Sequence, residues 1–416
     1  MSSGPQAAGV ATKARSLFRG LALFLAATLA LPAAAAAIDE YPVGANPGGI
    51  TAGPDGALWF VEEGTSTIAR ITTSGSVTNR FSVPTAGTTL PPTDPNYVNA
   101  LDQITAGPDG ALWFTQPRDN QIGKITTGGA LTEYTVSVPG ARPDAITRGP
   151  DNNLWFTAPG ASAIGRITTG GSISLFPGAA PGAQDIAAGP DGALWFTASL
   201  GNSIGRITTS GAITAHYPVP TPGAEPAGIT QGPGGGLWFT ESAVGQIAQI
   251  STSGTISEYP GAGAAPSAIA AGTDGALWFT QSLGNAISRS TTAGAITNHF
   301  AVPTPASEPS DITAGPDGAL WFTEFAANKI GRIATAGPVV VTPPPTNPPL
   351  IKKKKRCKVP KLKGLTVKKA KKKLKRAKCK FRVRGRGRVV KTSPKAGKRT
   401  TKRVKVTAKP KRRQQR

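Results

Sequence analysis

A block of eight residues, Gly-Pro-Asp-Gly-Ala-Leu-Trp-Phe, recurs with small variations seven times along this chain of 416 residues. The seven blocks contain every tryptophan of the sequence, 40 to 54 residues apart: Trp59, Trp113, Trp155, Trp195, Trp238, Trp278 and Trp321. A period of this length is typical of repeat architectures, in which each unit is one supersecondary structure that packs on its neighbours. The repeat therefore constrains the fold more than any other feature.

Each unit contains four short runs of β-branched or aromatic residues separated by Gly, Pro, Asn and Asp, which predicts four strands with tight turns. Asp-Gly pairs such as Asp55-Gly56 and Asp317-Gly318 favour hairpin turns, because glycine accepts a positive φ. One sheet of about 40 residues cannot bury both of its faces, whereas seven sheets stacked radially can. We therefore predict an all-β, seven-bladed β-propeller whose tryptophans pack between blades rather than bind a cofactor or a sugar.

The two ends of the repeat array predict how the ring closes. The seventh unit stops after residues 330–333 and lacks the outer strand that the fifth unit has at residues 256–260. A matching run, Ile-Asp-Glu-Tyr-Pro, begins at Ile38. Pairing this N-terminal strand with the seventh unit would close the propeller and leave no open sheet edge.

The N-terminus is typical of an export signal. Three basic residues precede the apolar run 20–31, and alanines fill residues 33–37, so we expect a signal peptide cut near Ala37. The apolar run is shorter than the ~20 residues of a membrane-spanning helix, and we expect no transmembrane segment in the mature chain. The predicted organisation is a signal peptide (1–37), the propeller (38–337), a proline-rich then basic linker (338–356), a small domain (357–408) and a basic tail (409–416).

Charge divides the chain into two parts. The formal net charge is +25, but residues 351–416 hold 33 basic residues and no acidic one, while residues 38–350 hold 11 basic and 22 acidic residues. The Arg-Gly run at 384–388 resembles nucleic-acid-binding tails. The export signal argues against that partner, since the polyanions outside the membrane are cell-wall polymers and anionic lipid headgroups. We therefore expect a secreted, cell-wall-associated protein.

Two stretches of the seventh unit, Gly315–Glu324 and residues 328–333, resemble the GPDGALWFTE and NKIGRI motifs of the virginiamycin B lyase family. The resemblance extends over about residues 38–337. It implies a seven-bladed propeller and a Mg²⁺-dependent carbon–oxygen lyase, which opens the ester of a cyclic depsipeptide antibiotic by elimination. In that family a Glu-Pro-His motif, with a Glu that ends the LWFTE motif of the same repeat, supplies two metal ligands and a histidine base. A histidine suits proton abstraction near neutral pH, and Mg²⁺ stabilises the enolate.

This resemblance implies Glu308 and Glu324 of the seventh unit as the metal ligands, with Glu225 and Glu241 of the fifth unit as a weaker pair. Ser310 stands where the family has its histidine, so no catalytic residue is assigned there. An unactivated serine is a poor base.

Other titratable residues have separate predicted places. His216 and His299 lie on predicted outer strands, far from the axis. Asp144, Asp185 and Asp311 lie at the starts of innermost strands, which predicts an acidic mouth at one end of the axis. Whether one of these aspartates acts as the base is left open.

The C-terminal region has the pattern V-P-x-L-x-G-x-T from Val359, a helical stretch with Thr366 as its N-cap, and S-P-x-x-G from Ser393. This resembles the PASTA domain, over about residues 357–408, and implies recognition of peptidoglycan. The lack of any acidic residue favours general polyanion binding. In an exported protein we predict a disulfide between Cys357 and Cys379, with free thiols as the alternative.

Two functions follow. The first is an exported, wall-associated propeller that resembles virginiamycin B lyase, an antibiotic-resistance enzyme, with its activity lost or altered because the histidine is missing. The alternative is a non-catalytic propeller that binds cell wall or peptidoglycan through its basic PASTA-like domain. Either could hold a small cyclic peptide at the axis.

Overall fold

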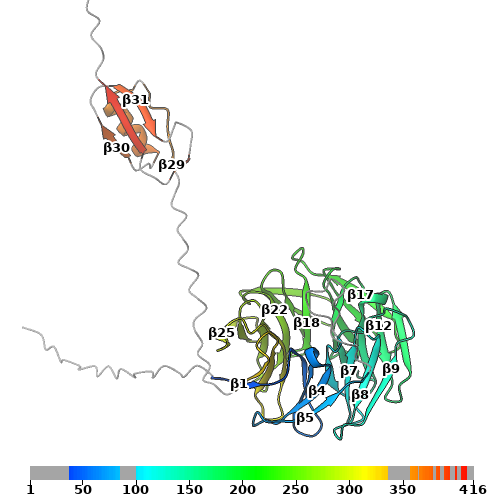
Figure 1. Ribbon diagram of the computed structural model, residues 1–416. Coiled ribbons are helices and arrows are strands. Elements are labelled where there is room, and N and C mark those ends of the chain that lie inside the picture. Colours follow the sequence, from blue (N-terminus) through cyan, green and yellow to red (C-terminus); the bar gives the residue numbers. More distant parts are fainter. Residues whose placement is uncertain are drawn as a thin grey trace, which may run out of the picture.

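The computed structural model describes residues 37–84, 100–335, 357–363 and 365–377, and four short strands between residues 381 and 409. Its first two ranges form seven four-stranded antiparallel sheets arranged around a central axis (Figure 1). The predicted seven-bladed propeller is therefore confirmed. Residues 1–36, 336–356 and 410–416 lie outside the described residues, so the predicted signal peptide, linker and tail remain predictions.

The strands run from the axis outward in the order of the sequence, and blades are numbered here in the same order. Blade 1 consists of β2 (Pro47–Ala52), β3 (Leu58–Glu62), β4 (Thr67–Ile71) and β5 (Val77–Ser82). Blade 2 consists of β6 (Ile104–Ala106), β7 (Leu112–Gln116), β8 (Gln121–Ile125) and β9 (Leu131–Thr135). Blade 3 consists of β10 (Ile146–Arg148), β11 (Leu154–Ala158), β12 (Ala163–Ile167) and β13 (Ile173–Pro177). Short 3-10 turns, η1 (Glu63–Thr65) and η2 (Pro159–Ala161), join the second and third strands of blades 1 and 3.

Blades 4 to 7 follow the same pattern. Blade 4 consists of β14 (Ala183–Ala188), β15 (Leu194–Ala198), β16 (Ser203–Ile207) and β17 (Ile213–Pro218), and blade 5 of β18 (Pro226–Gln231), β19 (Leu237–Glu241), β20 (Gln246–Ile250) and β21 (Ile256–Pro260). Blade 6 consists of β22 (Pro266–Ala271), β23 (Leu277–Gln281), β24 (Ala286–Ser290) and β25 (Ile296–Ala301). Blade 7 consists of β26 (Pro309–Ala314), β27 (Leu320–Glu324) and β28 (Lys329–Ile333) with β1 (Ile38–Pro42).

The N-terminal strand closes the ring. Strand β1 pairs antiparallel with β28, from Ile38 opposite Ile333 to Pro42 opposite Lys329. This pairing gives blade 7 its fourth strand and covers its outer edge, as the sequence predicted.

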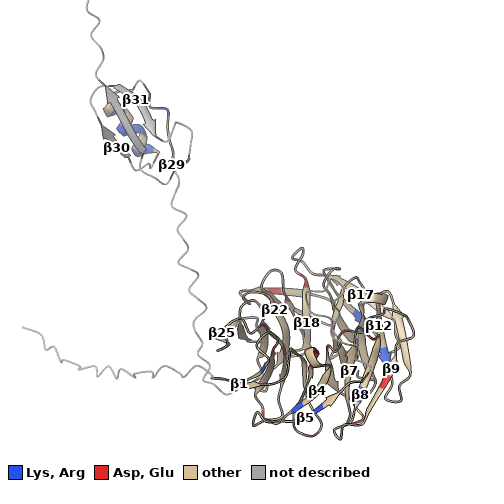
Figure 2. Cartoon of the chain, in the orientation of Figure 1, with Lys and Arg blue, Asp and Glu red and all other residues tan. Residues whose placement is uncertain are grey.

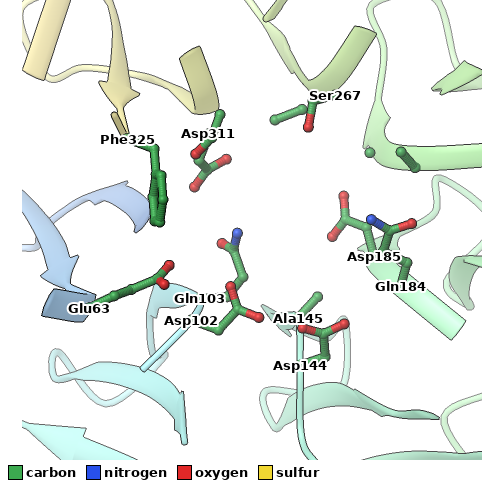
Figure 3. A pocket seen from close by; sticks show the side chains of 14 residues that line it. Glu63, Asp102, Gln103, Asp144, Ala145, Gln184, Asp185, Ser267, Asp311 and Phe325 are labelled. Atoms are coloured by element: carbon green, nitrogen blue, oxygen red, sulfur yellow. The ribbon is translucent and has the colours of Figure 1, made fainter. Parts of the chain in front are cut away.

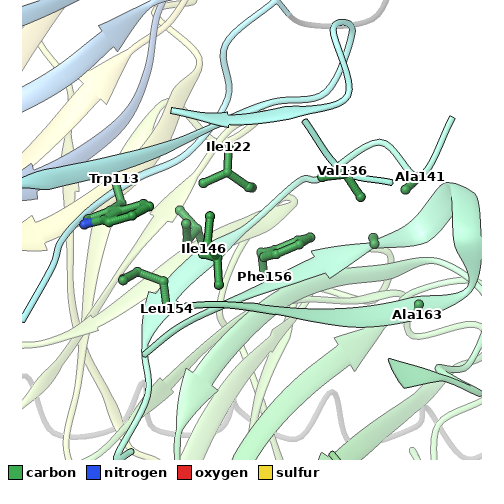
Figure 4. Close-up of a cluster of buried hydrophobic side chains, with 10 residues drawn as sticks. Trp113, Ile122, Val136, Ala141, Ile146, Leu154, Phe156 and Ala163 are labelled. Atoms are coloured by element: carbon green, nitrogen blue, oxygen red, sulfur yellow. The ribbon is translucent and has the colours of Figure 1, made fainter. Parts of the chain in front are cut away.

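Apolar side chains fill the space between adjacent blades. In one such cluster Trp113 and Ile122 of blade 2 pack against Ile146, Leu154 and Phe156 of blade 3 (Figure 4). Each of the seven tryptophans is at most 1% exposed. Their role as packing residues between blades is therefore confirmed.

An aspartate in the first hairpin turn of six blades holds the tryptophan of the same blade. Its Oδ1 accepts a hydrogen bond from the indole Nε1 at 3.0–3.1 Å, as Asp317 does from Trp321. In five of these blades its Oδ2 also pairs with a basic residue of the third strand, as Asp317 does with Arg332 at 2.8 Å. Blade 5 has Gly234 at this position, and the Nε1 of Trp238 has no hydrogen-bond partner among the described residues.

The C-terminal region forms a separate small α+β unit. It contains β29 (Cys357–Lys358), α1 (Val367–Arg376), β30 (Phe381–Arg384), β31 (Arg388–Ser393), β32 (Arg399–Thr400) and β33 (Val404–Lys409). Strand β33 pairs parallel with β30 and antiparallel with β31. Helix α1 begins after Thr366, whose Oγ1 accepts a hydrogen bond from the N–H of Lys369 at 3.4 Å, which confirms the predicted N-cap. Cys379 lies outside the described residues, so the disulfide with Cys357 remains a prediction.

The turn aspartate offers a test of how the blades are stabilised. Replacing Asp317 by Ala leaves the buried Trp321 Nε1 without an acceptor, so the free energy of unfolding should fall by about 1–3 kcal/mol. Asp39→Ala is the matched control, because Asp39 pairs with the same Arg332 but is 52% exposed; it should cost at most about 1 kcal/mol. Urea unfolding followed by tryptophan fluorescence reports the propeller alone, since it holds all seven tryptophans. Equal losses in the two variants would contradict this account.

Candidate functional site

A pocket of about 330 Å³ opens at one end of the propeller axis (Figure 3). Residues from the starts of the innermost strands line most of it: Asp102, Gln103, Asp144, Ala145, Gln184, Asp185, Ala227, Gly228, Ser267, Ala268, Ser310 and Asp311. Glu63 and Phe325, which follow second strands, complete the lining. The predicted acidic axial mouth therefore exists.

The repeat explains this arrangement. In each blade two residues precede the isoleucine of the innermost strand, as Ser310 and Asp311 precede Ile312 in blade 7. Seven-fold repetition brings equivalent positions together around the axis. The first of the two positions holds Gly48, Asp102, Asp144, Gln184, Ala227, Ser267 and Ser310, and the second holds Gly49, Gln103, Ala145, Asp185, Gly228, Ala268 and Asp311.

Asp185 and Asp311 link neighbouring blades through their carboxylates. Asp185 accepts hydrogen bonds from the backbone N–H of Ile186 in its own blade and of Ile229 in blade 5, both at 2.7 Å. Asp311 accepts equivalent bonds from Ile312 and from Ile50 of blade 1, both at 2.8 Å. Burial raises the pKa of Asp185 to about 7 and that of Asp311 to about 6, although these hydrogen bonds oppose the shift.

Asp102 and Asp144 form a carboxyl pair on the same wall of the pocket (Figure 3). Burial, followed by the charge of Asp144 and a hydrogen bond to its side chain, raises the pKa of Asp102 well above its usual range. The carboxyl group of Asp102 therefore holds its proton more tightly than an exposed aspartate does. Both occupy the position that Ser310 holds in blade 7.

Three residues that line the pocket were not predicted from the sequence: Asp102, Glu63 and Phe325. The innermost strand of blade 2 lacks the proline that precedes the corresponding residue in five other blades, and blade 2 follows the longest interval between repeats. Counting back two residues from Ile104 would have identified Asp102. Glu63 and Phe325 lie one residue beyond the second strand, where the repeats share no motif.

The predicted metal ligands of blade 7 lie just before β26 and at the end of the adjacent strand β27, outside the residues that line the pocket. Glu308 is exposed and precedes β26, while Glu324 ends β27 and is fully buried. Their backbones meet where the N–H of Phe325 donates to the carbonyl oxygen of Glu308 at 3.2 Å. Ser310, which the family resemblance places in the histidine position, lies in the pocket with its Oγ 3.1 Å from Thr323 Oγ1.

Glu324 is suited to bind a cation. Neither of its carboxyl oxygens has a hydrogen-bond partner of good geometry among the described residues. Burial, with the neighbouring charge of Glu40, raises the pKa of Glu324 to about 8. The described residues contain no group of three His, Cys, Asp or Glu side chains that could hold a metal ion. Mg²⁺ often uses only one or two carboxylates and retains several waters, so Glu324 with the exposed Glu308 fits this ion.

The weaker pair in blade 5 has the same placement: Glu225 is exposed, and Glu241 is fully buried, with neither oxygen in a hydrogen bond of good geometry among the described residues. His216 and His299 lie on the outer strands β17 and β25, are exposed, and do not line the pocket, as predicted. In the part of the chain that the structure describes, no helix is long and apolar enough to cross a membrane.

The raised pKa of Asp185 predicts a measurable pH dependence of stability. Between about pH 4 and pH 7 the folded state keeps a proton on Asp185 that the unfolded chain has lost, so the free energy of unfolding falls as the pH rises. Asp185→Asn removes this contribution and should make the decline shallower by at most about 1.4 kcal/mol per pH unit. Urea unfolding at pH 4.5, 5.5 and 6.5 in EDTA measures both slopes. Identical slopes would show that Asp185 is ionised in the folded protein.

Comparison with known families agrees with this architecture. The chain matches the virginiamycin B lyase family over residues 90–262 and 182–349, and the PASTA domain over residues 358–408. A comparison with curated proteins gave no match.

Solved structures with a similar fold include a catalytically inactive histidine-to-alanine variant of virginiamycin B lyase from Staphylococcus aureus, in complex with quinupristin. It is 35% identical, with a TM-score of 0.65 over 72% of this chain and 99% of that one. A streptogramin B lyase is 36% identical, with a TM-score of 0.64, and the match covers 71% of this chain and 97% of that one. A more distant structure, the extracellular domain of a hybrid two-component system from B. thetaiotaomicron, shares only the fold. It is 13% identical, with a TM-score of 0.56, and the match covers 73% of this chain and 43% of that one. The chain therefore belongs to the virginiamycin B lyase family and carries a PASTA domain after its propeller.

Proposed function

We propose that this chain is an exported, cell-wall-associated propeller that binds a small cyclic peptide in its axial pocket and has lost the histidine-dependent elimination of its family. The observation that carries the proposal is Ser310, which lines the pocket at the position of the family histidine. A relative in which a histidine is replaced by alanine is described as catalytically inactive and was solved with quinupristin. Loss of a histidine and retention of a ligand are therefore compatible on this fold.

The pocket has groups suited to a peptide ligand. Gln103, Gln184 and Ser267 offer amide and hydroxyl groups for hydrogen bonds to peptide units, and Phe325 offers an aromatic face. The carboxylates around them favour a ligand with a cationic group or with N–H donors.

Glu308 and Glu324 would hold Mg²⁺ if the family metal binds. The ion would act as a Lewis acid toward the ester carbonyl of the ligand. The two glutamates would supply carboxylate oxygens from the start of β26 and the end of β27, and Glu324 would lose its proton to the solvent on binding.

The Asp102–Asp144 pair favours a second candidate function, an altered elimination with a carboxylate base. Elimination requires a base that removes the proton on the carbon beside the carbonyl, while the carbon–oxygen bond breaks and the ester oxygen leaves as a carboxylate. The raised pKa of Asp102 makes its ionised carboxylate a stronger base than that of an exposed aspartate, so it can accept such a proton. Both aspartates lie in the pocket, at the position equivalent to that of the family histidine.

Turnover of a type B streptogramin separates the two candidates. With Mg²⁺, the full chain should leave the antibiotic intact, whereas Ser310→His should open the ring at unchanged mass, in a reaction that EDTA stops. Ser310→Ala is the matched control and should remain inactive. Liquid chromatography with mass detection follows both the retention time and the mass.

Ring opening by the unsubstituted chain would have one of two meanings, which substitutions of Asp144 and Asp102 separate. Ring opening by the unsubstituted chain that falls at least about 100-fold in Asp144→Asn would favour the carboxylate base. Ring opening that neither Asp144→Asn nor Asp102→Asn reduces would contradict both candidates.

The PASTA domain supports the proposed location and partner. Helix α1 buries Ala370 and Leu374, and its lysines and its arginine are exposed. Figure 2 marks these basic residues in blue along the helix. The domain has no acidic residue to balance them. A surface of this charge binds peptidoglycan-associated or other wall polyanions mainly through electrostatic attraction.

Charge substitutions in α1 test this interaction. The triple variant Lys368→Glu, Lys372→Glu, Lys375→Glu should weaken co-sedimentation of the full chain with purified cell walls by at least about tenfold at low salt. The matched variant with Arg at the same three positions should bind like the unsubstituted chain. Rising salt should weaken both the unsubstituted chain and the Arg variant. If the Glu and Arg variants bind equally well, the helix does not form the binding surface.

A further inference from the structure

The last residue of the second strand faces a residue of the outer strand within the same blade. In blade 1, Glu62 pairs with Arg80, whose Nε lies 3.0 Å from its Oε2. In blade 2 the side-chain amide of Gln116 donates to Glu133 at 3.0 Å. In blade 6, Gln281 lies 2.7 Å from Nδ1 of His299. Each of these pairs combines groups of complementary charge or hydrogen-bonding capacity.

Blades 5 and 7 have two acids at these positions. Glu324 faces Glu40 in blade 7, and Glu241 faces Glu258 in blade 5. In blade 7 the chain itself supplies a cation, because Lys329 Nζ lies 2.8 Å from Glu40 Oε2. Lys329 is opposite Glu324 in the strand register, and the residue opposite Glu241 is Gln246. Blade 5 therefore has a neutral residue where blade 7 has its lysine.

The blade 5 pair, Glu241 with Glu258, lacks a balancing positive charge in the part of the chain that the structure describes. Glu241 is 0% exposed, and its carboxyl group meets that of Glu258 without a hydrogen-bond donor from any other residue there. Glu258 accepts one hydrogen bond, from the backbone N–H of Thr221 at 2.8 Å. An unbalanced charge in the interior of a protein is strongly destabilising, so either a proton or a metal cation must lie between these side chains.

We infer that a hard divalent cation, Ca²⁺ or Mg²⁺, binds between the carboxylates of Glu241 and Glu258 and connects strands β19 and β21. Carboxylate oxygens are the preferred ligands of both ions, and water completes their coordination. Glu258 is partly exposed, so an ion can reach the pair from solvent. This site lies within a blade, away from the axial pocket, and does not depend on the proposed function.

Titration calorimetry of the full chain, stripped of metal by EDTA, tests the inference. The titration uses the Glu308→Gln variant as its background, so that an ion bound in blade 7 does not add to the measured stoichiometry. In this background, added Ca²⁺ or Mg²⁺ should bind with a stoichiometry of one. Thermal unfolding should shift upward by about 5 °C at a hundredfold excess of the ion over its Kd.

Two variants assign the binding to blade 5. Glu258→Gln should abolish both the heat of binding and the thermal shift, while the Gln oxygen can still accept from Thr221. Gln246→Lys should weaken both and should raise the Tm in EDTA, because it supplies the side-chain cation that Lys329 supplies in blade 7. Glu133→Gln, the equivalent outer-strand change in blade 2, is the matched control and should leave ion binding unchanged.

No ion binding in the Glu308→Gln background, or binding that persists in Glu258→Gln, would overturn the inference. The first result would indicate that a shared proton alone balances the pair.

Discussion

The regularity of the ring depends on one repeated contact. An aromatic side chain on the outer strand of a blade packs between the tryptophan of its own blade and a turn glycine of the next blade. Tyr41, Phe81, Tyr134, Phe176, Tyr217 and Tyr259 each stack on the tryptophan of their own blade, with ring centroids 5.3–5.8 Å apart. The other face of each ring meets a turn glycine of the next blade, as Tyr41 meets Gly75. A Cβ at Gly75 would collide with the ring, and the positive φ of 83° there also favours glycine. Because Tyr41 lies on β1, the strand that closes the ring also continues this stacking into blade 1.

The uniform scaffold leaves the axial positions free to differ between blades. Tryptophan, phenylalanine and turn aspartate stabilise nearly every blade, so the two residues before the isoleucine of each innermost strand can differ in type from blade to blade. Those residues lie around the pocket and include Gly, Ala, Ser, Gln and Asp. A substitution at Ser310 can therefore change the chemistry of the pocket without changing the fold, since the function of a propeller resides in such sites.

The repeat made the fold predictable, because one strand–turn pattern written seven times admits few architectures. The N-terminal strand, the packing role of the tryptophans, the N-cap of α1 and the acidic mouth formed by Asp144, Asp185 and Asp311 all followed from position within the repeat. Asp102 did not, since the irregular start of blade 2 hides its alignment with Ser310. Nor did the pairing of Glu241 with Glu258, which lie on different strands and meet only through the register of β19, β20 and β21. Such contacts depend on three-dimensional packing that motif spacing does not encode.

A crystal structure of the full chain grown with a type B streptogramin and Mg²⁺ tests the central claim most directly. The account predicts density for an unopened ring in the axial pocket, in contact with Ser310 and near the Asp102–Asp144 pair. Density for a ring-opened product would contradict the loss of elimination. A ligand bound elsewhere, or an empty pocket at saturating antibiotic, would contradict the pocket as the peptide site.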